Sequence, residues 1–381
     1  MKRNLIFGTM FILVLLSPLF LTAKQDYHIL TDLFVLGQEQ ALKERVEKGV
    51  KEYATYDQAM KLSAKLHWKL FHESIAENVF TGKGDQFFYA GCDAVDDLLG
   101  VHYVSPEVLE RICQSQQSIK DALEERGVRY LIVMAPNKER IYPEMLQDVL
   151  YGQVGVAGPS RKEQVLRALT ENTDVEVLDL TDALLKAKEE HKVYMDTDNH
   201  WNYEGSYAGY CAIIEYLRRT WPELPMVSRE QLEISYVDKG GKNLSINACL
   251  SDQVKERDIP LMAFREGLTC YPVDADYEDP GKMGTPADMI LLENAGNEGL
   301  PNVMVMGDSF TGWSKIYEGT FYESEWDINY FMGESFHRYV RYHYLNNPLN
   351  LSLVSKENSD LVIRFFLEGN LELLAEGYVE K

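Results

Sequence analysis

The sequence predicts an α/β fold in which a parallel β-sheet carries helices on both faces. Short apolar segments rich in β-branched residues alternate with amphipathic helical segments along most of the chain, and this alternation is typical of repeated βα units. The 381 residues are 45% hydrophobic and 26% charged, values that allow a buried core and argue against a mainly disordered protein. We therefore expect one large α/β domain with a short additional segment.

The charge balance and the cysteines exclude several classes of protein. The formal net charge is −22, from 60 acidic and 38 basic residues. Such a surface repels phosphate backbones, so we expect no nucleic-acid partner. The five cysteines are spread singly without a Cys-x-x-Cys pair, which argues against a structural zinc site and a dense disulfide framework. We expect a site built from side chains alone, without a metal or cofactor.

Residues 1–24 have the pattern of a targeting segment. Lys2 and Arg3 precede Asn4 to Ala23, an uncharged stretch rich in Leu, Ile, Phe and Val. A positive flank followed by an apolar run is typical of a secretory signal or a signal anchor. The run is about as long as one bilayer crossing requires, which favours an uncleaved anchor over a cleaved signal. In either case we expect the rest of the chain outside the cytoplasm, anchored to the membrane or, after cleavage, secreted.

Residues 25–80 are charged and have helical periodicity. Their apolar residues recur at helical spacings: Val35, Leu42, Val46, Leu62, Leu66, Leu70 and Phe71. This pattern predicts a helical stalk or a cap helix. The change in texture that follows predicts the main domain over residues 81–381.

The main domain contains segments typical of buried strands and of amphipathic helices. The predicted strands are Arg129 to Ala135, Val175 to Leu180, Asn302 to Met306 and Asp360 to Phe366. The predicted helices are Pro106 to Arg126, Arg161 to Thr170, Asp182 to Glu190 and Tyr203 to Arg219. Open α/β sheets place their sites at the carboxyl ends of strands, so the candidate site residues should follow the predicted strands.

A serine follows the strand Asn302 to Met306 directly, in the segment Gly307 to Phe310 (Gly-Asp-Ser-Phe). A tight turn at this point can expose Ser309 as a nucleophile, and a helix that began there would direct its N–H groups at an oxyanion. Asp308 or Ser309 can also be an ordinary helix N-cap. The residues alone leave both interpretations open.

Asp198 and His200 lie two residues apart in the segment Tyr194 to Asn202. In an extended backbone they project to the same side, so the carboxylate can fix the imidazole tautomer and leave the other ring nitrogen as a base. Trp201 is expected to line the site and exclude water from it. A metal site built from Asp196, Asp198 and His200 is the less favoured alternative, because no second His or Glu stands at helical ligand spacing.

A polar loop, Pro136 to Glu144, follows the strand that ends at Ala135. It lies at the carboxyl end of a strand, where Lys138 and Tyr142 can contact a substrate. A capped loop with solvated charges explains the same composition. Lys138 and Tyr142 are therefore candidate substrate-binding residues beside that simpler interpretation.

The three motifs together resemble those of the alginate O-acetyltransferase family of the AlgX/AlgJ type, an SGNH-hydrolase-like group. Thr197 to Trp201 is similar to the family's Thr-Asp-x-His-Trp motif, Gly307 to Phe310 to its Gly-Asp-Ser-Phe motif, and Pro136 to Glu144 to its Pro-x-Lys-x-x-x-Tyr-Pro-Glu segment. Phe87 to Gly100 and Ser359 to Leu374 are similar to its opening and closing segments. The resemblance covers roughly residues 80 to 381 in order, which short motifs would not do by chance.

The resemblance implies an SGNH-like (flavodoxin-like) three-layer fold with Ser309 as the nucleophile, His200 as the base and Asp198 as the residue that orients it. It also implies a membrane-bound O-acyltransferase that supplies acetyl groups and a cell-surface or secreted polysaccharide that accepts them. One departure stands out. Where the family often has a Gly-Asp-Leu segment, Gly240 to Ser245 reads GGKNLS, with Asn243 in place of the Asp.

Three functions fit these observations. The first is an extracytoplasmic polysaccharide O-acetyltransferase that works through a serine acyl-enzyme. The second is an acetyl esterase that uses the same three residues with water as the acceptor. The third is a non-catalytic glycan-binding or assembly protein, suggested by 23 Tyr, 15 Phe and 5 Trp that can stack on sugars. The complete triad argues against the third, and the resemblance favours the first over the second.

Overall fold

The computed structural model describes residues 54–379 apart from 274–288, 313–315, 318–319, 322–326 and 344–347. The chain divides into two compact units, residues 1–75 and residues 76–381. In the first unit the structure describes helix α4 (Ala54–Phe71), which lies within the predicted helical segment 25–80. The predicted anchor lies outside the described residues. Within the described part of the chain, no helix combines the length and the apolar character that a membrane crossing requires.

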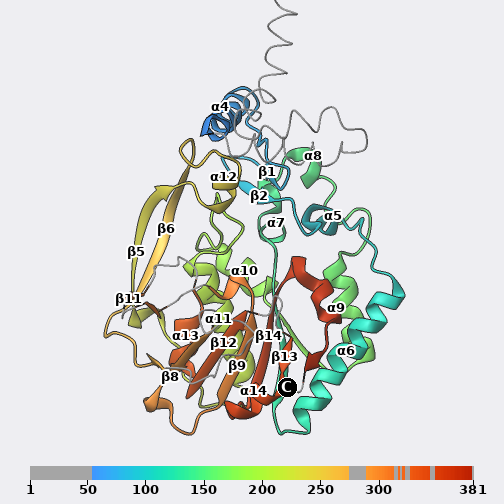
Figure 1. Cartoon of the computed structure of the whole chain (residues 1–381), viewed down its shortest axis with the longest axis vertical. Helices are drawn as coiled ribbons and strands as arrows, with labels where there is room; N and C mark the ends of the chain where they lie inside the picture. Colours follow the sequence, from blue (N-terminus) through green and yellow to red (C-terminus); the bar gives the residue numbers. More distant parts are fainter. Residues whose placement is uncertain are drawn as a thin grey trace, which may run out of the picture. The chain divides into compact units, whose positions relative to one another are not determined.

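A seven-stranded sheet forms the centre of the second unit, with strand order β4-β3-β14-β9-β12-β8-β7 (Figure 1). Its strands are β3 (Arg129–Ala135), β4 (Glu176–Asp179), β7 (Tyr271–Pro272), β8 (Ile290–Glu293), β9 (Asn302–Gly307), β12 (Arg338–His343) and β14 (Leu361–Leu367). All four predicted strands are present, as β3, β4, β9 and β14.

The sheet departs from the expected all-parallel arrangement at one edge. The five strands from β4 to β12 are parallel, whereas β8 is antiparallel to β12 and β7 is antiparallel to β8. The connection between β8 and β9, residues 294–301, explains the reversal. It is shorter than the dozen or more residues that a parallel crossover needs, so β8 runs against β9. The sheet is therefore mixed.

Helices cover both faces of the sheet, which gives the predicted three layers. Alternate strand residues enter two separate cores: Leu131 and Val133 lie in one, and Tyr130 and Ile132 lie in the other. The first core contains residues of α10 (Thr181–Lys188), α11 (Tyr203–Leu217) and α13 (Asn329–Ser335). The second contains residues of α6 (Pro106–Glu124), α9 (Arg161–Asn172) and α14 (Leu351–Lys356). The four predicted helices are thus confirmed as α6, α9, α10 and α11.

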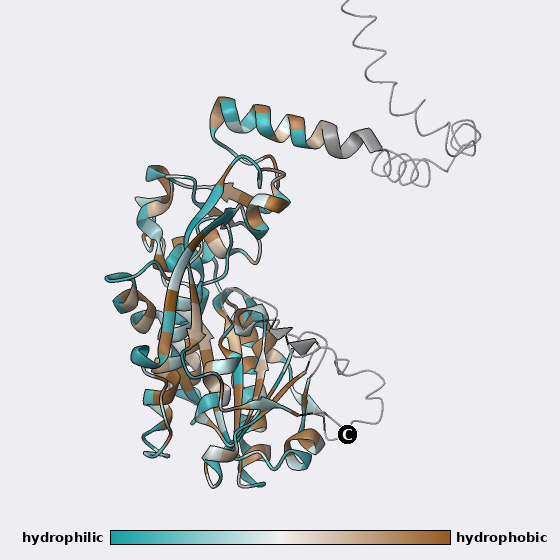
Figure 2. Ribbon diagram, turned by 90° about the vertical axis from the view of Figure 1, so that its left-hand side faces the viewer, coloured by the Kyte–Doolittle hydropathy of each residue, from teal (hydrophilic) through white to brown (hydrophobic). Residues whose placement is uncertain are grey.

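The remaining elements connect or extend this framework. They are β1 (Val79–Thr81), β2 (Phe87–Tyr89), α5 (Ala94–Leu99), α7 (Lys138–Ile141), η1 (Pro143–Met145), α8 (Asp148–Tyr151), η2 (Arg229–Gln231), β5 (Leu232–Gly240), α12 (Asn243–Asn247), β6 (Lys255–Phe264), η4 (Ala295–Asn297), η5 (Ser309–Thr311), β10 (Ile316–Tyr317), β11 (Thr320–Phe321), β13 (Leu349–Asn350), η6 (Glu368–Ala375) and β15 (Tyr378–Val379). Strands β5 and β6 form a long antiparallel ribbon outside the central sheet. Brown, hydrophobic residues run along the strands of the central sheet, while teal residues predominate in the loops (Figure 2).

Candidate active site

Two segments meet at the carboxyl edge of the sheet and carry the predicted catalytic side chains. Residues 307–312, here called the nucleophile turn, follow the end of β9. Residues 196–202, here called the base loop, lead into α11. The side chain of Asn202 accepts the backbone N–H groups of Glu204 and Gly205 at 3.0 and 3.2 Å. Asn202 is therefore the N-cap of α11, the role expected of an asparagine at this position, and it fixes the end of the base loop.

Asp308 ties the nucleophile turn to the neighbouring strands. Its Oδ1 accepts the N–H of Phe310 at 2.9 Å, and its Oδ2 accepts the N–H of Leu367, the last residue of β14, at 2.8 Å. The buried Arg341 of β12 donates from Nη2 to the carbonyl oxygen of Asp308 at 2.9 Å. These contacts immobilise the turn, while Ser309 itself stays partly exposed.

The helix considered at Ser309 in the sequence analysis does not form. In its place is a single 3-10 turn, η5 (Ser309–Thr311). The N–H of Phe310 is bound by the Asp308 carboxylate and the N–H of Gly312 by the carbonyl of Ser309. These two N–H groups have acceptors within the turn, and the segment is a 3-10 turn in place of the α-helix whose N-terminus was considered for an oxyanion.

His200 lies between Ser309 and Asp198, although Ser309 is 109 residues further along the chain. Its Nε2 is 2.9 Å from Ser309 Oγ, and its Nδ1 is 2.8 Å from Asp198 Oδ1. Both distances lie within hydrogen-bond reach. Asp198 and His200 are only 2% and 6% exposed. The structure thus brings the three predicted catalytic side chains into one hydrogen-bonded row, with the hydroxyl at its accessible end.

The surroundings of Asp198 keep its carboxylate ionised. Burial opposes ionisation, but hydrogen bonds from the ring and the N–H of His200 and from the N–H of Asn243 outweigh it and lower the pKa of Asp198. A carboxylate in this position accepts from Nδ1–H and so directs the lone pair of Nε2 toward Ser309. The arrangement can therefore take a proton from the serine hydroxyl.

Trp201 lies in the core rather than on a substrate-facing wall. It is fully buried, and its indole Nε1 donates to the carbonyl oxygen of Phe310 at 3.0 Å. α11 has a glycine where it passes this ring: a Cβ at Gly209 would lie 3.1 Å from two ring atoms of Trp201, Cη2 and Cζ3. Trp201 therefore joins the base loop to the nucleophile turn, which corrects the expectation that it lines the site.

Lys138 is also buried, at 2% exposure. Its Nζ donates to the backbone carbonyls of Phe87, Asp196 and Asp198 at 2.7, 2.8 and 3.2 Å. These three acceptors use all the hydrogens of an ammonium group, which leaves none for a substrate. The predicted role of Lys138 in substrate binding is thus contradicted by its position beneath the base loop.

Tyr142 is half-buried and supports the segment just before the base loop. Its hydroxyl accepts the N–H of Val193 at 3.0 Å, and its ring lies 4.5 Å from Nζ of Lys188. This placement also differs from the predicted contact with substrate. The third motif, which the sequence allows as a substrate loop or as a capped loop with solvated charges, instead places Lys138 and Tyr142 against the base loop and the segment before it.

Asp196 points away from His200. Its carboxylate accepts from Nε2 of Gln86 at 2.5 Å and from Nζ of Lys192 at 3.1 Å. Among the residues that the structure describes, no group of three or more His, Cys, Asp and Glu side chains is placed to hold a metal ion. The metal site considered for Asp196, Asp198 and His200 therefore finds no support in the geometry.

Glu256 is a site residue that the sequence did not reveal. It comes from β6 and is fully buried. Its carboxylate accepts the N–H of Asp196 at 2.8 Å, the N–H of Thr197 at 2.7 Å and the hydroxyl of Thr197 at 2.7 Å. It belongs to none of the three sequence motifs, and it lies about sixty residues from the base loop in the chain. Its only signal is a carboxylate within a strand, which is too common to single out.

Asn243, which stands where the family often has an Asp, is the first residue of α12, and α12 packs against the base loop. The N–H of Asn243 lies 3.3 Å from Asp198 Oδ2, and the N–H of Leu244 donates to the carbonyl of Thr197 at 3.1 Å. These are backbone contacts that any residue except proline at position 243 allows. The missing Asp therefore leaves the support of Asp198 intact.

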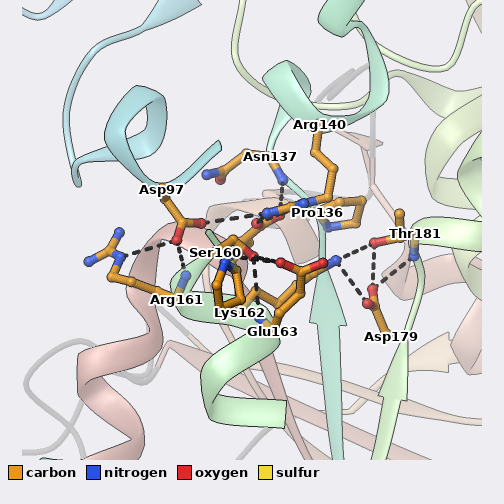
Figure 3. Close-up of polar contacts among 12 residues, drawn as sticks. Asp97, Pro136, Asn137, Arg140, Ser160, Arg161, Lys162, Glu163, Asp179 and Thr181 are labelled. Carbon is orange, nitrogen blue, oxygen red and sulfur yellow. Dashed lines mark hydrogen bonds and ion pairs between the residues drawn. The ribbon is translucent and has the colours of Figure 1, made fainter. Parts of the chain in front are cut away.

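A buried ionic network (Figure 3) lies at the end of β14, next to Leu367, whose N–H donates to Asp308 of the nucleophile turn. Glu368, which follows the end of β14, accepts the N–H of Asn137 at 3.1 Å and pairs with Arg140 at 2.6 Å. Asp97 lies 3.6 Å from both Arg140 and Arg161. Burial and the nearby Glu368 raise the pKa of Asp97 to about 6. The network fixes the loop after β3 to the end of β14.

Comparison with known proteins identifies relatives of this chain. A family model for an SGNH hydrolase-like domain, acetyltransferase AlgX, matches residues 105–341. The probable alginate O-acetylase AlgJ of Pseudomonas syringae pv. tomato is 29% identical over 145 residues, a match that covers 38% of this chain and 34% of that protein. The match thus spans about a third of the length of that curated relative.

Two solved structures share the fold. Bacillus cereus PatB1 with a sulfonyl adduct has a TM-score of 0.55 at 13% identity and covers 77% of this chain and 95% of its own. A DHHW family protein from Eubacterium siraeum has a TM-score of 0.54 at 12% identity and covers 81% and 98%. The resemblance noted in the sequence is confirmed by the family match, which spans more than half of the residues. The chain belongs to the AlgX acetyltransferase family of SGNH hydrolase-like domains.

Proposed function

We propose that this protein is an O-acetyltransferase that acts outside the cytoplasm and moves an acetyl group onto hydroxyls of a cell-surface or secreted polysaccharide. The observation that carries the proposal is the position of His200, 2.9 Å from Ser309 Oγ and 2.8 Å from Asp198 Oδ1. A serine activated in this way is suited to acyl transfer. Membership of the AlgX family and the name of the AlgJ relative support acetyl as the group and a polysaccharide as its acceptor.

The first half of the reaction places the acetyl group on Ser309. Oγ attacks the carbonyl carbon of an acetyl ester, and Nε2 of His200 takes the hydroxyl proton. The bond between that carbon and the donor's alcohol oxygen then breaks. The departing oxygen receives the proton from His200, and the ionised Asp198 stabilises the imidazolium that exists between these two transfers.

The second half returns the enzyme to its starting state. A sugar hydroxyl gives its proton to Nε2 of His200 and attacks the carbonyl carbon of acetyl-Ser309. The bond to Oγ breaks, and Oγ recovers the proton from His200. The products are an acetylated sugar and free Ser309, so the cycle needs neither an oxidant nor a reductant.

A membrane-bound O-acyltransferase is the proposed supplier of the acetyl donor. The apolar segment Asn4 to Ala23 would hold the protein at the membrane, where such a supplier also lies. The polysaccharide is not specified beyond its class, because alginate is named only for the relative.

The proposal is tested with purified full-length protein in detergent, a chromogenic acetyl ester and a panel of oligosaccharide acceptors. Mass spectrometry of the sugars measures transfer, and release of the chromophore measures ester cleavage. We expect acetylated sugar with wild-type protein and neither product with Ser309→Ala. Acetate as the only product with every acceptor would favour the esterase, and full activity of Ser309→Ala would contradict the assignment of the site.

A further inference from the structure

Two buried charged side chains bind the backbone of the base loop from opposite sides. Lys138, on α7, takes the carbonyl oxygens of Asp196 and Asp198. Glu256, on β6, takes the N–H groups of Asp196 and Thr197. Two N–H groups of the loop thus donate to one carboxylate, and two of its carbonyl oxygens accept from one ammonium group.

Lys138 and Glu256 each bind backbone groups of the base loop rather than each other. The ammonium of Lys138 has three carbonyl acceptors, the third being Phe87. The carboxylate of Glu256 also accepts the hydroxyl of Thr197 at 2.7 Å and pairs with Nζ of Lys192 at 3.0 Å. Each buried charge is therefore satisfied in a different way, which keeps both side chains in a single position.

Burial of these charges is costly for the fold. Removing an ammonium and a carboxylate from water is unfavourable, and well-packed apolar residues at such positions often give equal or greater stability. Lys138 and Glu256 are 2% and 0% exposed. Both charged side chains contact the same loop from opposite sides. We infer that they hold the loop backbone in a geometry that apolar side chains could not hold.

The geometry that they hold is that of the catalytic row. Lys138 binds the carbonyl of Asp198, while the carboxylate of the same residue lies 2.8 Å from Nδ1 of His200. Thr197, the residue before, is held by Glu256 through its N–H and its hydroxyl. A shift of the loop backbone would therefore move His200 relative to Ser309 Oγ.

We propose that Lys138 and Glu256 form a clamp of two positioning residues that sets the distance between His200 and Ser309. The clamp rests on the proposed function, because it matters only if His200 activates Ser309. Neither side chain touches the reacting atoms. A displacement of about 1 Å at a reacting group can lower a rate by about 10²-fold, and we expect an effect of this size when one side of the clamp is removed.

The test measures the reactivity of Ser309 without any acetyl substrate. Phenylmethanesulfonyl fluoride modifies an activated serine: Oγ bonds to sulfur, fluoride leaves, and the hydroxyl proton passes to His200 and then to water. The rate of modification is followed by peptide mass spectrometry. We expect Lys138→Met and Glu256→Gln to be slowed about 10²-fold, and Lys138→Arg, which keeps the charge and the donors, to be slowed less.

A matched control separates clamping from general stability. Lys162, on α9, is about as buried as Lys138, and its Nζ pairs with Asp179 at 2.8 Å and Thr181 at 2.6 Å, neither of which belongs to the base loop (Figure 3). Lys162→Met should lower the melting temperature, as Lys138→Met should. Only Lys138→Met should slow modification of Ser309 when both variants are folded by circular dichroism.

A spectroscopic signature gives the second readout. The proton shared by His200 Nδ1 and Asp198 should give a low-field proton NMR signal in wild-type protein, and this signal should shift or broaden in Lys138→Met and Glu256→Gln but not in Lys162→Met. If Lys138→Met fails to fold, Glu256→Gln decides the matter by both measurements.

The outcomes separate the clamp from the proposed function. If folded Lys138→Met or Glu256→Gln reacts with the sulfonyl fluoride at the wild-type rate, the clamp is refuted. A wild-type protein that is modified at Ser309 but never transfers acetyl refutes the proposed function, while the comparison of variants still supports the clamp. If wild-type Ser309 is not modified at all, both the proposed site and the clamp fail.

Discussion

The nucleophile turn and the base loop are held in place in different ways. The turn contains one of its own supports, Asp308, which binds both Phe310 and the end of β14, and it also receives hydrogen bonds from Arg341 and Trp201. The base loop is held by Lys138 and Glu256, which lie 58 and 60 residues from Asp196 in the chain. The serine half of the site thus carries one of its supports within its own motif. The histidine half depends on side chains from two distant elements.

Removal of either Ser309 or His200 should have the largest effect. Ser309→Ala and His200→Ala should each lower the kcat for ester cleavage by about 10⁶-fold, and the double variant should lose little more, because the residues act as one unit. Steady-state kinetics with a chromogenic acetyl ester measure all three variants. Losses that multiply in the double variant would show that turn and loop act independently.

The next variant tests the orienting role of Asp198 separately from proton transfer by His200. Asp198→Ala should lower kcat by about 10⁴-fold, since His200 keeps its Nε2 near Ser309 but loses the partner that fixes its tautomer. KM for the ester should change little. A loss as large as that of His200→Ala, in a protein that remains folded, would mean that Asp198 also sets the position of the base loop.

A smaller effect tests the claim that the turn is locally supported. Asp308→Ala removes the acceptor of the N–H groups of Phe310 and Leu367. One buried and one partly buried donor left without partners should lower the free energy of unfolding by about 2–4 kcal/mol. We expect kcat to fall far less than in Asp198→Ala. Chemical denaturation and kinetics on the same samples check this, and an unchanged stability would show that the turn is held by other contacts.

The smallest effect is a pH dependence that belongs to the base loop alone. Burial lowers the pKa of Lys138 to about 8, against the attraction of the carboxylates of Asp196, Glu256, Glu139 and Asp198. In the unfolded chain the ordinary value of 10.5 applies. Between these values the unfolded state binds more protons, so the contribution of this group to the free energy of unfolding rises with pH.

Activity should move in the opposite direction over the same range. As Lys138 loses its proton, its hold on the loop carbonyls weakens, and kcat should fall on the alkaline side of about pH 8. Lys138→Met, which is already slow, should lack this decline. Profiles of kcat and of chemical denaturation between pH 7 and 10 measure both trends. An identical alkaline decline in the variant would assign it to another group.

Elements with a regular pattern of apolar residues could be predicted from the sequence. Elements that mix apolar and charged residues could not. β3 and β14 are short apolar runs, and α11 has an apolar stripe beneath a capping Asn202. β12 lies inside the sheet between β9 and β8, yet it carries Arg338 and Arg341. The buried Arg341 donates to Thr311 and Asp308 of the nucleophile turn, a tertiary contact that periodicity does not reveal.

The same distinction applies to the residues of the candidate site. Ser309, His200 and Asp198 stand in short motifs whose spacing already suggests their chemistry. A lysine in a polar loop looks like a solvated residue, and only the folded chain shows Lys138 beneath the base loop. Glu256 stands in no motif at all. Residues that act through others are specified by packing, so the sequence alone does not mark them.

The most direct test of the account follows one acetyl group through Ser309. Wild-type protein is mixed briefly with the acetyl ester, freed from excess ester, and then given an oligosaccharide acceptor. Peptide mass spectrometry reads Ser309 before and after the acceptor is added. We predict acetyl on Ser309 that passes to the sugar, and none on Ser309 in His200→Ala. Acetylated sugar that forms without acetyl ever reaching Ser309 would contradict the account.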